Sequence, residues 1–168
     1  MVSPVMEPSD FSSFLDSVAE RTAAPGGGSV AAVVAAFAAA LTEMAARYAD
    51  EGEAATRAGT LRARFLELAA EDAEAYGAVL GARGEERQQA LSRAADVPLE
   101  LAECAVEVTQ LANRLAEEGN PTLRGDAMTA ALLATAATKA AANLVEINLE
   151  ARPEDERIAR ARTLAKRS

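Results

Sequence analysis

The 168-residue sequence contains no histidine and no tryptophan, and it has a single cysteine, Cys104. Without histidine, a Ser-His-Asp triad, a His-ligated zinc site and the usual base near neutral pH are all excluded. One cysteine can form neither an intramolecular disulfide nor a thiolate metal site, and Cys104 falls in a helical pattern that predicts a small space-filling side chain. We therefore expect no metal. Acid–base chemistry must come from carboxylates, lysine, tyrosine, serine or the backbone.

Positive charge is also scarce, because 17 lysines and arginines stand against 26 acidic residues, for a formal net charge of −9. This excess argues against nucleic acid or an anionic membrane surface as a partner. An anionic small molecule would need a local basic or amide-lined pocket. The stretch Met1 to Pro8 has no basic region followed by an apolar segment, so we expect no signal peptide and a cytoplasmic protein.

Aromatic residues make up only 4% of the chain, whereas half of its residues are apolar. A core of alanine, leucine and valine suits closely packed helices, and no strand pattern, repeat or linker interrupts the chain. The sequence therefore predicts one all-α domain over residues 1–168, a bundle of about five to six helices, several of them long and antiparallel. The expected helices span 9–21, 29–49, 54–82, 85–118, 126–151 and the residues after 153, with Pro98 kinking or splitting the fourth.

The turn with the fewest side chains reads Pro25-Gly26-Gly27-Gly28-Ser29. Three consecutive glycines are costly in backbone entropy, so this turn needs backbone without side chains. Ser29 is placed to cap the following helix, and free amides at a helix start can bind an anion. The alternative is that the glycines only let two helices approach closely.

From Ser29 to Thr42 the next helix has no charged residue. A helix that is apolar on every side is expected to be buried on every side. At roughly 14 residues this run is shorter than the about 20 that span a bilayer. We expect a central helix of the bundle.

The helix predicted over 54–82 carries one carboxylate on its apolar stripe. At about 100° per residue, Asp72 lies within roughly 20° of the centre of that stripe. Burying a carboxylate without partners costs several kcal/mol. Asp72 is therefore either a structural group that holds a neighbouring helix or turn, or a functional group. The stripe consists of Leu61, Phe65, Leu68, Tyr76 and Val79.

Further polar candidates lie in the last third of the chain. Gly119-Asn120-Pro121 predicts a helix stop with a left-handed glycine or asparagine, and Asp126 can cap the next helix. Those local roles would explain both residues without any function.

The helix predicted over 126–151 is nearly uncharged, since between Ala127 and Leu149 only Lys139 and Glu146 carry charge. Asn143 then falls on an apolar side expected to be buried, with Asn148 nearby, and buried amides need hydrogen-bond partners. Two helices buried all round exceed what a 168-residue monomer accommodates, so we expect a two-fold homodimer.

Taken in chain order, these motifs resemble the cyclodeaminase/cyclohydrolase family of folate enzymes. That family comprises the C-terminal domain of formiminotransferase-cyclodeaminase and the free-standing bacterial methenyltetrahydrofolate cyclohydrolases. The resemblance covers nearly the whole chain, and its most specific pair joins the glycine turn to the late Asn…Ile-Asn-Leu helix. The matching segments are Phe14-Leu15-Asp16, Ala24-Pro25-Gly26-Gly27-Gly28-Ser29, Asp72…Tyr76, Ala94…Pro98-Leu99, Gly119-Asn120…Asp126 and Asn143…Ile147-Asn148-Leu149.

The resemblance implies an all-helical homodimer that acts on a one-carbon unit carried by tetrahydrofolate, its substrate, with no covalently bound cofactor. Members open or close the N5–CH–N10 bridge, either by hydrolysis or with release of ammonia. Asp72 and Asp126 become the candidate catalytic carboxylates, and which of them is the base stays open. The implied substrate-binding residues are Gly26, Gly27, Gly28, Ser29, Tyr76, Asn120, Asn143 and Asn148.

One departure from the family pattern concerns the anionic glutamate tail of folate. Many members carry a lysine-rich segment after the glycine-rich helix, whereas residues 47–53 here are net acidic. Either the tail is met by Arg47, Arg83, Arg124 or Lys139, or the preference for polyglutamate is weak. Two other classes remain open: an enzyme acting on another small amidine or amine, and a non-catalytic helical dimer that binds a ligand or a partner protein.

Overall fold

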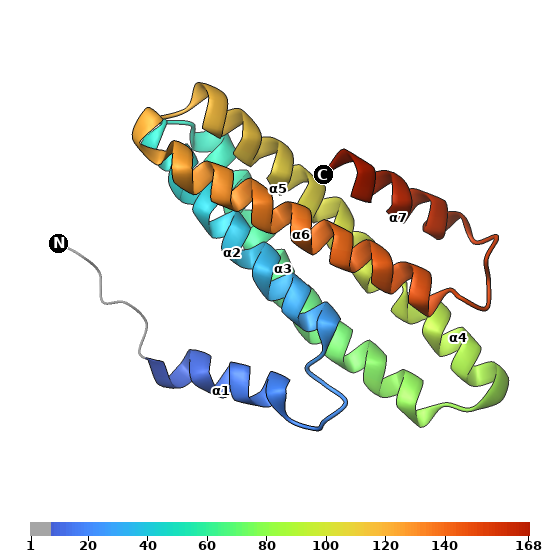
Figure 1. The fold of residues 1–168 in the computed structure, drawn as a ribbon. Helices are drawn as coiled ribbons and strands as arrows, with labels where there is room; N and C mark the ends of the chain where they lie inside the picture. The colour runs from blue at the N-terminus through green and yellow to red at the C-terminus, as the bar shows by residue number, and fades with distance from the viewer. Residues whose placement is uncertain (1–7) are drawn as a thin grey trace.

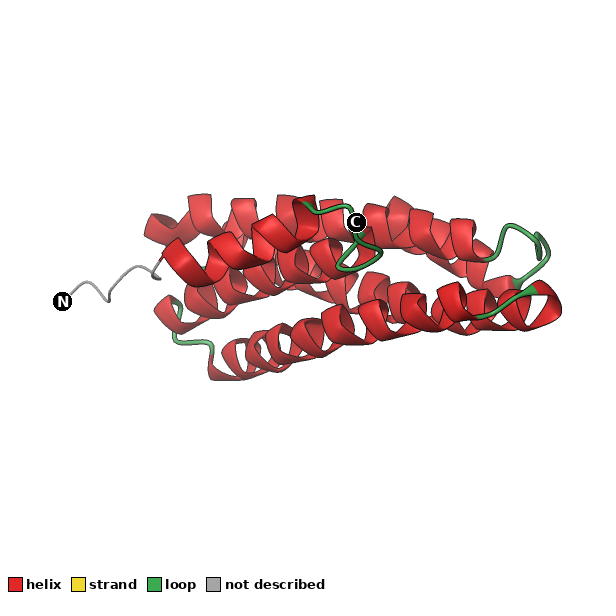
Figure 2. Cartoon of the chain, turned by 90° about the horizontal axis from the view of Figure 1, so that it is seen from below, coloured by secondary structure: helices red, strands yellow, loops and turns green. Residues whose placement is uncertain are grey.

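The computed structural model describes residues 8–168, which form an all-α bundle with no strand among them (Figures 1 and 2). The fold class predicted from the sequence is confirmed. The expectation about a signal peptide concerns residues that lie, except for Pro8, outside the described part. The elements are α1 (Pro8–Ala19), α2 (Gly27–Tyr48), α3 (Gly52–Gly81), α4 (Gly84–Ala94), α5 (Asp96–Glu118), the 3₁₀ turn η1 (Pro121–Leu123), α6 (Arg124–Asn148) and α7 (Glu156–Arg167).

Four long helices, α2, α3, α5 and α6, make the body of the bundle. α2 packs against α3 and α6, and α5 packs against α6. The shared core is rich in alanine on α2 and α6, with Leu61, Phe65 and Leu68 from α3 and Leu101 and Val108 from α5. Small side chains let helix axes approach to the short end of the usual 8–10 Å. Alanine content thus explains how few aromatic residues the core needs.

The residues between 84 and 118 form two helices rather than one. Ala95 separates α4 from α5, and the buried Pro98 lies in the first turn of α5, where a missing amide costs nothing. The split predicted from Pro98 is confirmed, but it lies at Ala95 rather than after Asp96-Val97. It brings the described residues to seven α-helices, one or two more than the sequence predicted.

The stop at residues 119–121 is confirmed, but its mechanism differs from the prediction. Neither Gly119 (φ −82°) nor Asn120 (φ −69°) is left-handed. Gly119 is required because a Cβ there would lie 2.5 Å from the carbonyl oxygen of Leu115. Asn120 caps η1, since its Oδ1 accepts from Thr122 N at 3.0 Å and its Nδ2 donates to Tyr48 O at 3.1 Å.

The expectation that two helices are buried on every side is wrong for the single chain. On α2, Phe37 is 46% exposed, and on α6, Leu132 is 70% and Ile147 is 63% exposed. Neighbouring helices cover only the inward half of each, and α1 lies away from the bundle (Figure 1). The α1 ring of Phe11 contacts Phe37 edge-on, with centroids 5.9 Å apart.

The membrane-length estimate made from the uncharged run Ser29–Thr42 does not apply to the whole of α2. The helix has 22 residues, so it and the segment Pro121–Asn148 are long and apolar enough to cross a membrane by length and composition. A core helix of a bundle passes the same test, and 61% of the apolar window of α2 is buried against other helices. The finding is weak evidence for a membrane span.

Candidate active site

A pocket of about 280 Å³ lies where the start of α2 meets the last third of α3 and the end of α6. It brings together six of the residues proposed from the sequence. They are Gly26, Gly27, Gly28, Asp72, Tyr76 and Asn148, and the remaining walls are Ala23, Ala24, Leu144 and Ile147. Segments that are 120 residues apart in the chain therefore share one pocket.

Asp72 sits directly against the backbone of the glycine turn. A Cβ on Gly28 would lie 2.0 Å from Asp72 Oδ1 and 2.4 Å from its Cγ, closer than such atoms approach. At Gly26 and Gly27, a Cβ would meet nothing within 4 Å. The absence of a side chain is thus needed at Gly28, and its reason is the approach of the Asp72 carboxylate.

The hydroxyl of Ser29 hydrogen-bonds to Asp72, and Ser29 does not cap α2. The residue at the N-cap position is Gly26, and Ser29 lies within the first turn. Its Oγ is 3.0 Å from Asp72 Oδ2 and 3.1 Å from Ala69 O, so its one proton can be donated to either oxygen. The cap prediction for Ser29 is wrong, because the helix starts two residues earlier and turns the hydroxyl towards α3.

The start of α2 also presents backbone amides near this pocket. The first bond of the helical ladder runs from Val30 N to Gly26 O at 3.0 Å. The amides of Gly27, Gly28 and Ser29 precede that ladder and carry the positive end of the helix dipole. The pocket therefore combines a carboxylate with a helix end that attracts negative charge.

Three predicted site residues do not reach this pocket within one chain. Asn120 bonds to the last residue of α2, which lies about 30 Å along that helix from Gly28. Asp126 is half-buried in the first turn of α6, where Leu123 is the N-cap, so its cap role is wrong as well. Asn143 is exposed on α6, contrary to the expectation of burial, because no helix among residues 8–168 covers that side of α6.

No lysine or arginine lines the pocket. Arg47, one of the cations considered for a glutamate tail, is paired with Glu43, which also accepts from Arg62 Nε at 3.0 Å. A larger hollow of about 450 Å³ is lined by Glu51, Arg57 and Arg114. Its arginines are held by Glu107 and Glu51, so it offers no free cation.

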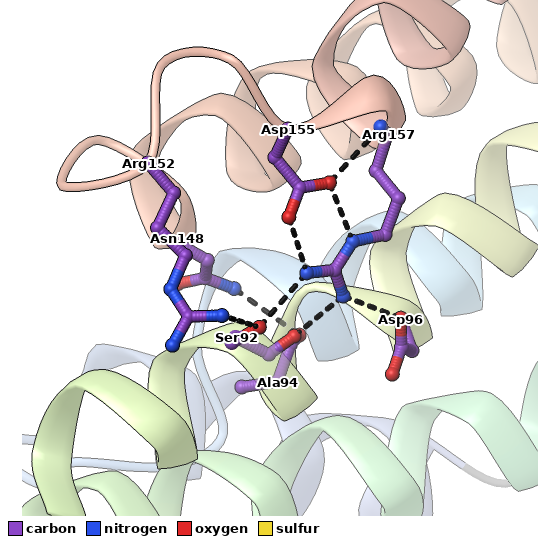
Figure 3. Close-up of polar contacts among 7 residues, drawn as sticks. All are labelled: Ser92, Ala94, Asp96, Asn148, Arg152, Asp155 and Arg157. Atoms are coloured by element: carbon purple, nitrogen blue, oxygen red, sulfur yellow. Dashed lines mark hydrogen bonds and ion pairs between the residues drawn. The ribbon is translucent and has the colours of Figure 1, made fainter.

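A second polar network borders Asn148 (Figure 3). Arg157 of α7 donates to both oxygens of Asp155 at 2.8–2.9 Å, to Ser92 O at 2.7 Å and Oγ at 2.8 Å, and to Asp96 Oδ1 at 2.7 Å. We call Arg157 with these three partners the Arg157 clamp. It ties α7 to the junction between α4 and α5.

The clamp gives one pH prediction. The hydrogen bonds from Arg157 lower the pKa of Asp155 from its ordinary 3.8 to about 2. A lowered folded-state pKa stabilises the fold above the unfolded value and loses that contribution as pH falls from about 4 to 2. Asp155→Asn should therefore flatten the acid arm of the stability curve over that window, measured by urea unfolding. An unchanged slope would contradict this.

Residues 10–167 match a family model described as formiminotransferase-cyclodeaminase. The chain is 35% identical to the methenyltetrahydrofolate cyclohydrolase of Methylorubrum extorquens, over 80% of this chain and 76% of that protein. It is 36% identical to the formimidoyltransferase-cyclodeaminase of Rattus norvegicus over 70% of this chain, but it spans only 26% of that longer protein.

Among solved structures, the formiminotetrahydrofolate cyclodeaminase of Thermotoga maritima superposes with a TM-score of 0.79. The two sequences are 30% identical, and the match covers 92% of this chain and 90% of the other. The family model and the structural match each cover most of this chain.

Proposed function

The chain belongs to the formiminotransferase-cyclodeaminase family, as its motifs predicted, and from this we propose that it acts on the N5–CH–N10 bridge of a tetrahydrofolate derivative. It is a folate-dependent enzyme of the cyclohydrolase or cyclodeaminase kind, with the folate as substrate. The observation that carries the proposal is the pocket in which Gly28, Asp72 and Asn148 meet. We also propose that residues 1–168 form one domain, that no further cofactor takes part, and that the enzyme is cytoplasmic.

Asp72 is the proposed base. In hydrolysis, water attacks the methenyl carbon and Asp72 takes one of its protons, which leaves a neutral carbinolamine. The protonated Asp72 returns that proton to N5 as the C–N5 bond breaks, and the hydroxyl proton is released, which gives the 10-formyl product. In the cyclodeaminase reaction, N10 attacks the carbon of the protonated formimino group, and Asp72 takes the N10 proton. Asp72 then passes that proton to the amino group, which leaves as ammonia and gives the methenyl cation.

The partner in the proposed assembly is a second copy of this chain. α2 and α6 lie side by side (Figure 1), and their outward sides form what we call the open face. It is largely apolar, with the exposed Lys139 of α6 as a charge on it, and burial of such a surface is what obligate dimers achieve. Its residues are Val33, Phe37, Ala40, Met44 and Tyr48 of α2 with Met128, Leu132, Ala136, Asn143 and Ile147 of α6.

A two-fold dimer would also explain the residues that miss the pocket. An axis that crosses α6 near its middle pairs the start of one α6 with the end of the other. Asp126 and Asn120 of one copy would then lie near Asn148 of its partner. On this arrangement Asp126 is the second carboxylate of a site shared between subunits.

Disruption of the open face tests the dimer. Leu132→Glu should convert a species of twice the chain mass into a monomer, because it places a charge in the centre of an apolar interface. Light scattering after size exclusion measures the mass. Leu66→Glu on α3, where the leucine is 53% exposed away from the open face, is the matched control and should stay dimeric. A monomeric wild type, or a dimeric Leu132→Glu, contradicts the proposal.

The reaction itself is tested by two absorbance assays. One follows loss of 5,10-methenyltetrahydrofolate, and the other follows its appearance from 5-formiminotetrahydrofolate. Turnover in the first alone identifies a cyclohydrolase, and turnover in the second identifies a cyclodeaminase. Absence of both, in a folded dimer, would overturn the proposed function. Cell fractionation tests the cytoplasmic location.

A further inference from the structure

The junction between α4 and α5 is held from two sides. The last carbonyls of a helix lack helical donors and need other partners. At the end of α4, the carbonyl of Ser92 accepts from Arg157 of the clamp at 2.7 Å. Two residues later, the carbonyl of Ala94 accepts from Asn148 Nδ2 at 3.1 Å. One short stretch of backbone therefore connects α7 to a side chain of the proposed active site.

The bond to Ala94 decides which way the Asn148 amide faces. A carbonyl oxygen can only accept, so the amide must turn its NH₂ group towards Ala94. Figure 3 shows the nitrogen of Asn148 directed at Ala94 and the oxygen directed away from it. Asn148 also lines the pocket with Asp72. Its uncommitted group is therefore an acceptor, Oδ1.

The remaining clamp contacts show how firmly the junction is fixed. Arg157 is held by a fork to Asp155, the N-cap of α7, and by Asp96 at the first residue of α5. Arg152, in the loop before α7, adds a bond from its Nη1 to Ser92 Oγ at 3.0 Å. Bidentate arginine pairs fix geometry as well as charge. Without Arg157, the carbonyl of Ser92 loses the contact that anchors it to α7.

We propose that Arg157 is a positioning residue, which holds the junction at Ser92–Ala94 so that Asn148 presents Oδ1 to the pocket beside Asp72. This rests on the proposed function, since it concerns the same site. Two acceptors side by side can take both hydrogens of one water molecule and leave its lone pair free for attack. Loss of the clamp frees the amide to flip, and its NH₂ group would then face the pocket in place of Oδ1.

The test compares Arg157→Gln and Arg157→Lys with Arg162→Gln. Arg162 lies on the same helix and is paired with Glu146 at 2.5 Å, so it is an arginine ion pair of α7 that does not touch the junction. The first readout is the side-chain amide signal of Asn148 in a ¹⁵N-labelled dimer, assigned by its loss in Asn148→Asp. The second is kcat and KM with methenyltetrahydrofolate and formiminotetrahydrofolate.

Arg157→Gln should shift the Asn148 signal and lower kcat about tenfold with a smaller change in KM, because the acceptor is misplaced rather than removed. Arg157→Lys should restore part of the rate, and Arg162→Gln should leave both readouts unchanged. An unshifted Asn148 signal and unchanged kcat in Arg157→Gln overturn the proposal.

If the wild type turns over neither folate, the proposed function is wrong. The Asn148 signal still tests whether Arg157 positions the Asn148 amide. If Arg157→Gln does not fold, Asp155→Asn at neutral pH takes its place, because it weakens the paired hydrogen bonds that hold the Arg157 guanidinium at the junction. An unshifted signal there, together with an unshifted Arg157→Lys, counts against the proposal.

Discussion

Asp72→Asn is expected to lower kcat by between about 10²- and 10⁴-fold, the range that a positioned base contributes. Asparagine keeps the volume of the side chain and an oxygen that can accept from Ser29 Oγ. It removes the group that takes the proton. Folding and dimer mass should therefore be retained while turnover is lost, as measured by the two absorbance assays and by thermal unfolding.

A structural role for Asp72 would give the opposite pattern. Loss of a partly buried hydrogen bond would lower the free energy of unfolding by about 1–3 kcal/mol and leave kcat largely intact. Asp126→Asn is the companion variant. If Asp126→Asn abolishes turnover and Asp72→Asn does not, the base is Asp126, reached from the partner subunit.

Gly28→Ala is expected to cost at least about a hundredfold in kcat/KM, although it adds one methyl group. The new Cβ would lie 2.0–2.6 Å from all three atoms of the Asp72 carboxylate, so that group must move. Displacement of a reacting group by about 1 Å is enough for such a loss. The same movement weakens the bond from Ser29, so the melting temperature should fall as well.

Gly27→Ala provides the matched control, one residue away in the same turn. A Cβ at Gly27 meets nothing within 4 Å, and the residue is the first of α2. Alanine is a better helix former than glycine by up to about 1 kcal/mol, so the melting temperature should stay or rise. Wild-type kinetics in Gly28→Ala would mean that the Asp72 carboxylate can accommodate the new methyl group. Its close approach would then not explain why residue 28 is glycine.

Local rules predicted the elements well because they depend on neighbours in the chain. The apolar period of 54–82 placed Asp72 on the stripe, and Pro98 predicted the split into α4 and α5. Local rules failed where a second element decided the outcome. Ser29 matched an N-cap pattern, yet its hydroxyl bonds to α3. Gly119 matched a left-handed helix stop, yet glycine is needed there because the carbonyl oxygen of Leu115 leaves no room for a Cβ.

Composition could not predict how the nearly uncharged helices α2 and α6 are buried. Their apolar side chains indicate that every side of each helix avoids water. They do not indicate whether the same chain or a second copy covers the outward sides. Asn143 and Asn148 are five residues apart on one helix, and only the packing of α4 and α7 distinguishes them. Asn148 meets the α4–α5 junction and the pocket, whereas Asn143 is exposed.

The sequence by itself determined that this protein is an all-α bundle without histidine or a thiolate metal site, with a carboxylate on an apolar stripe and a turn that needs backbone without side chains. Periodicity, helix-breaking residues and missing side-chain types are properties of the chain alone. Only the tertiary structure decided that Gly28 is the glycine the carboxylate requires and that Arg157 bonds to the same α4–α5 junction as Asn148. Those facts depend on distances between segments more than 40 residues apart, which no local pattern contains.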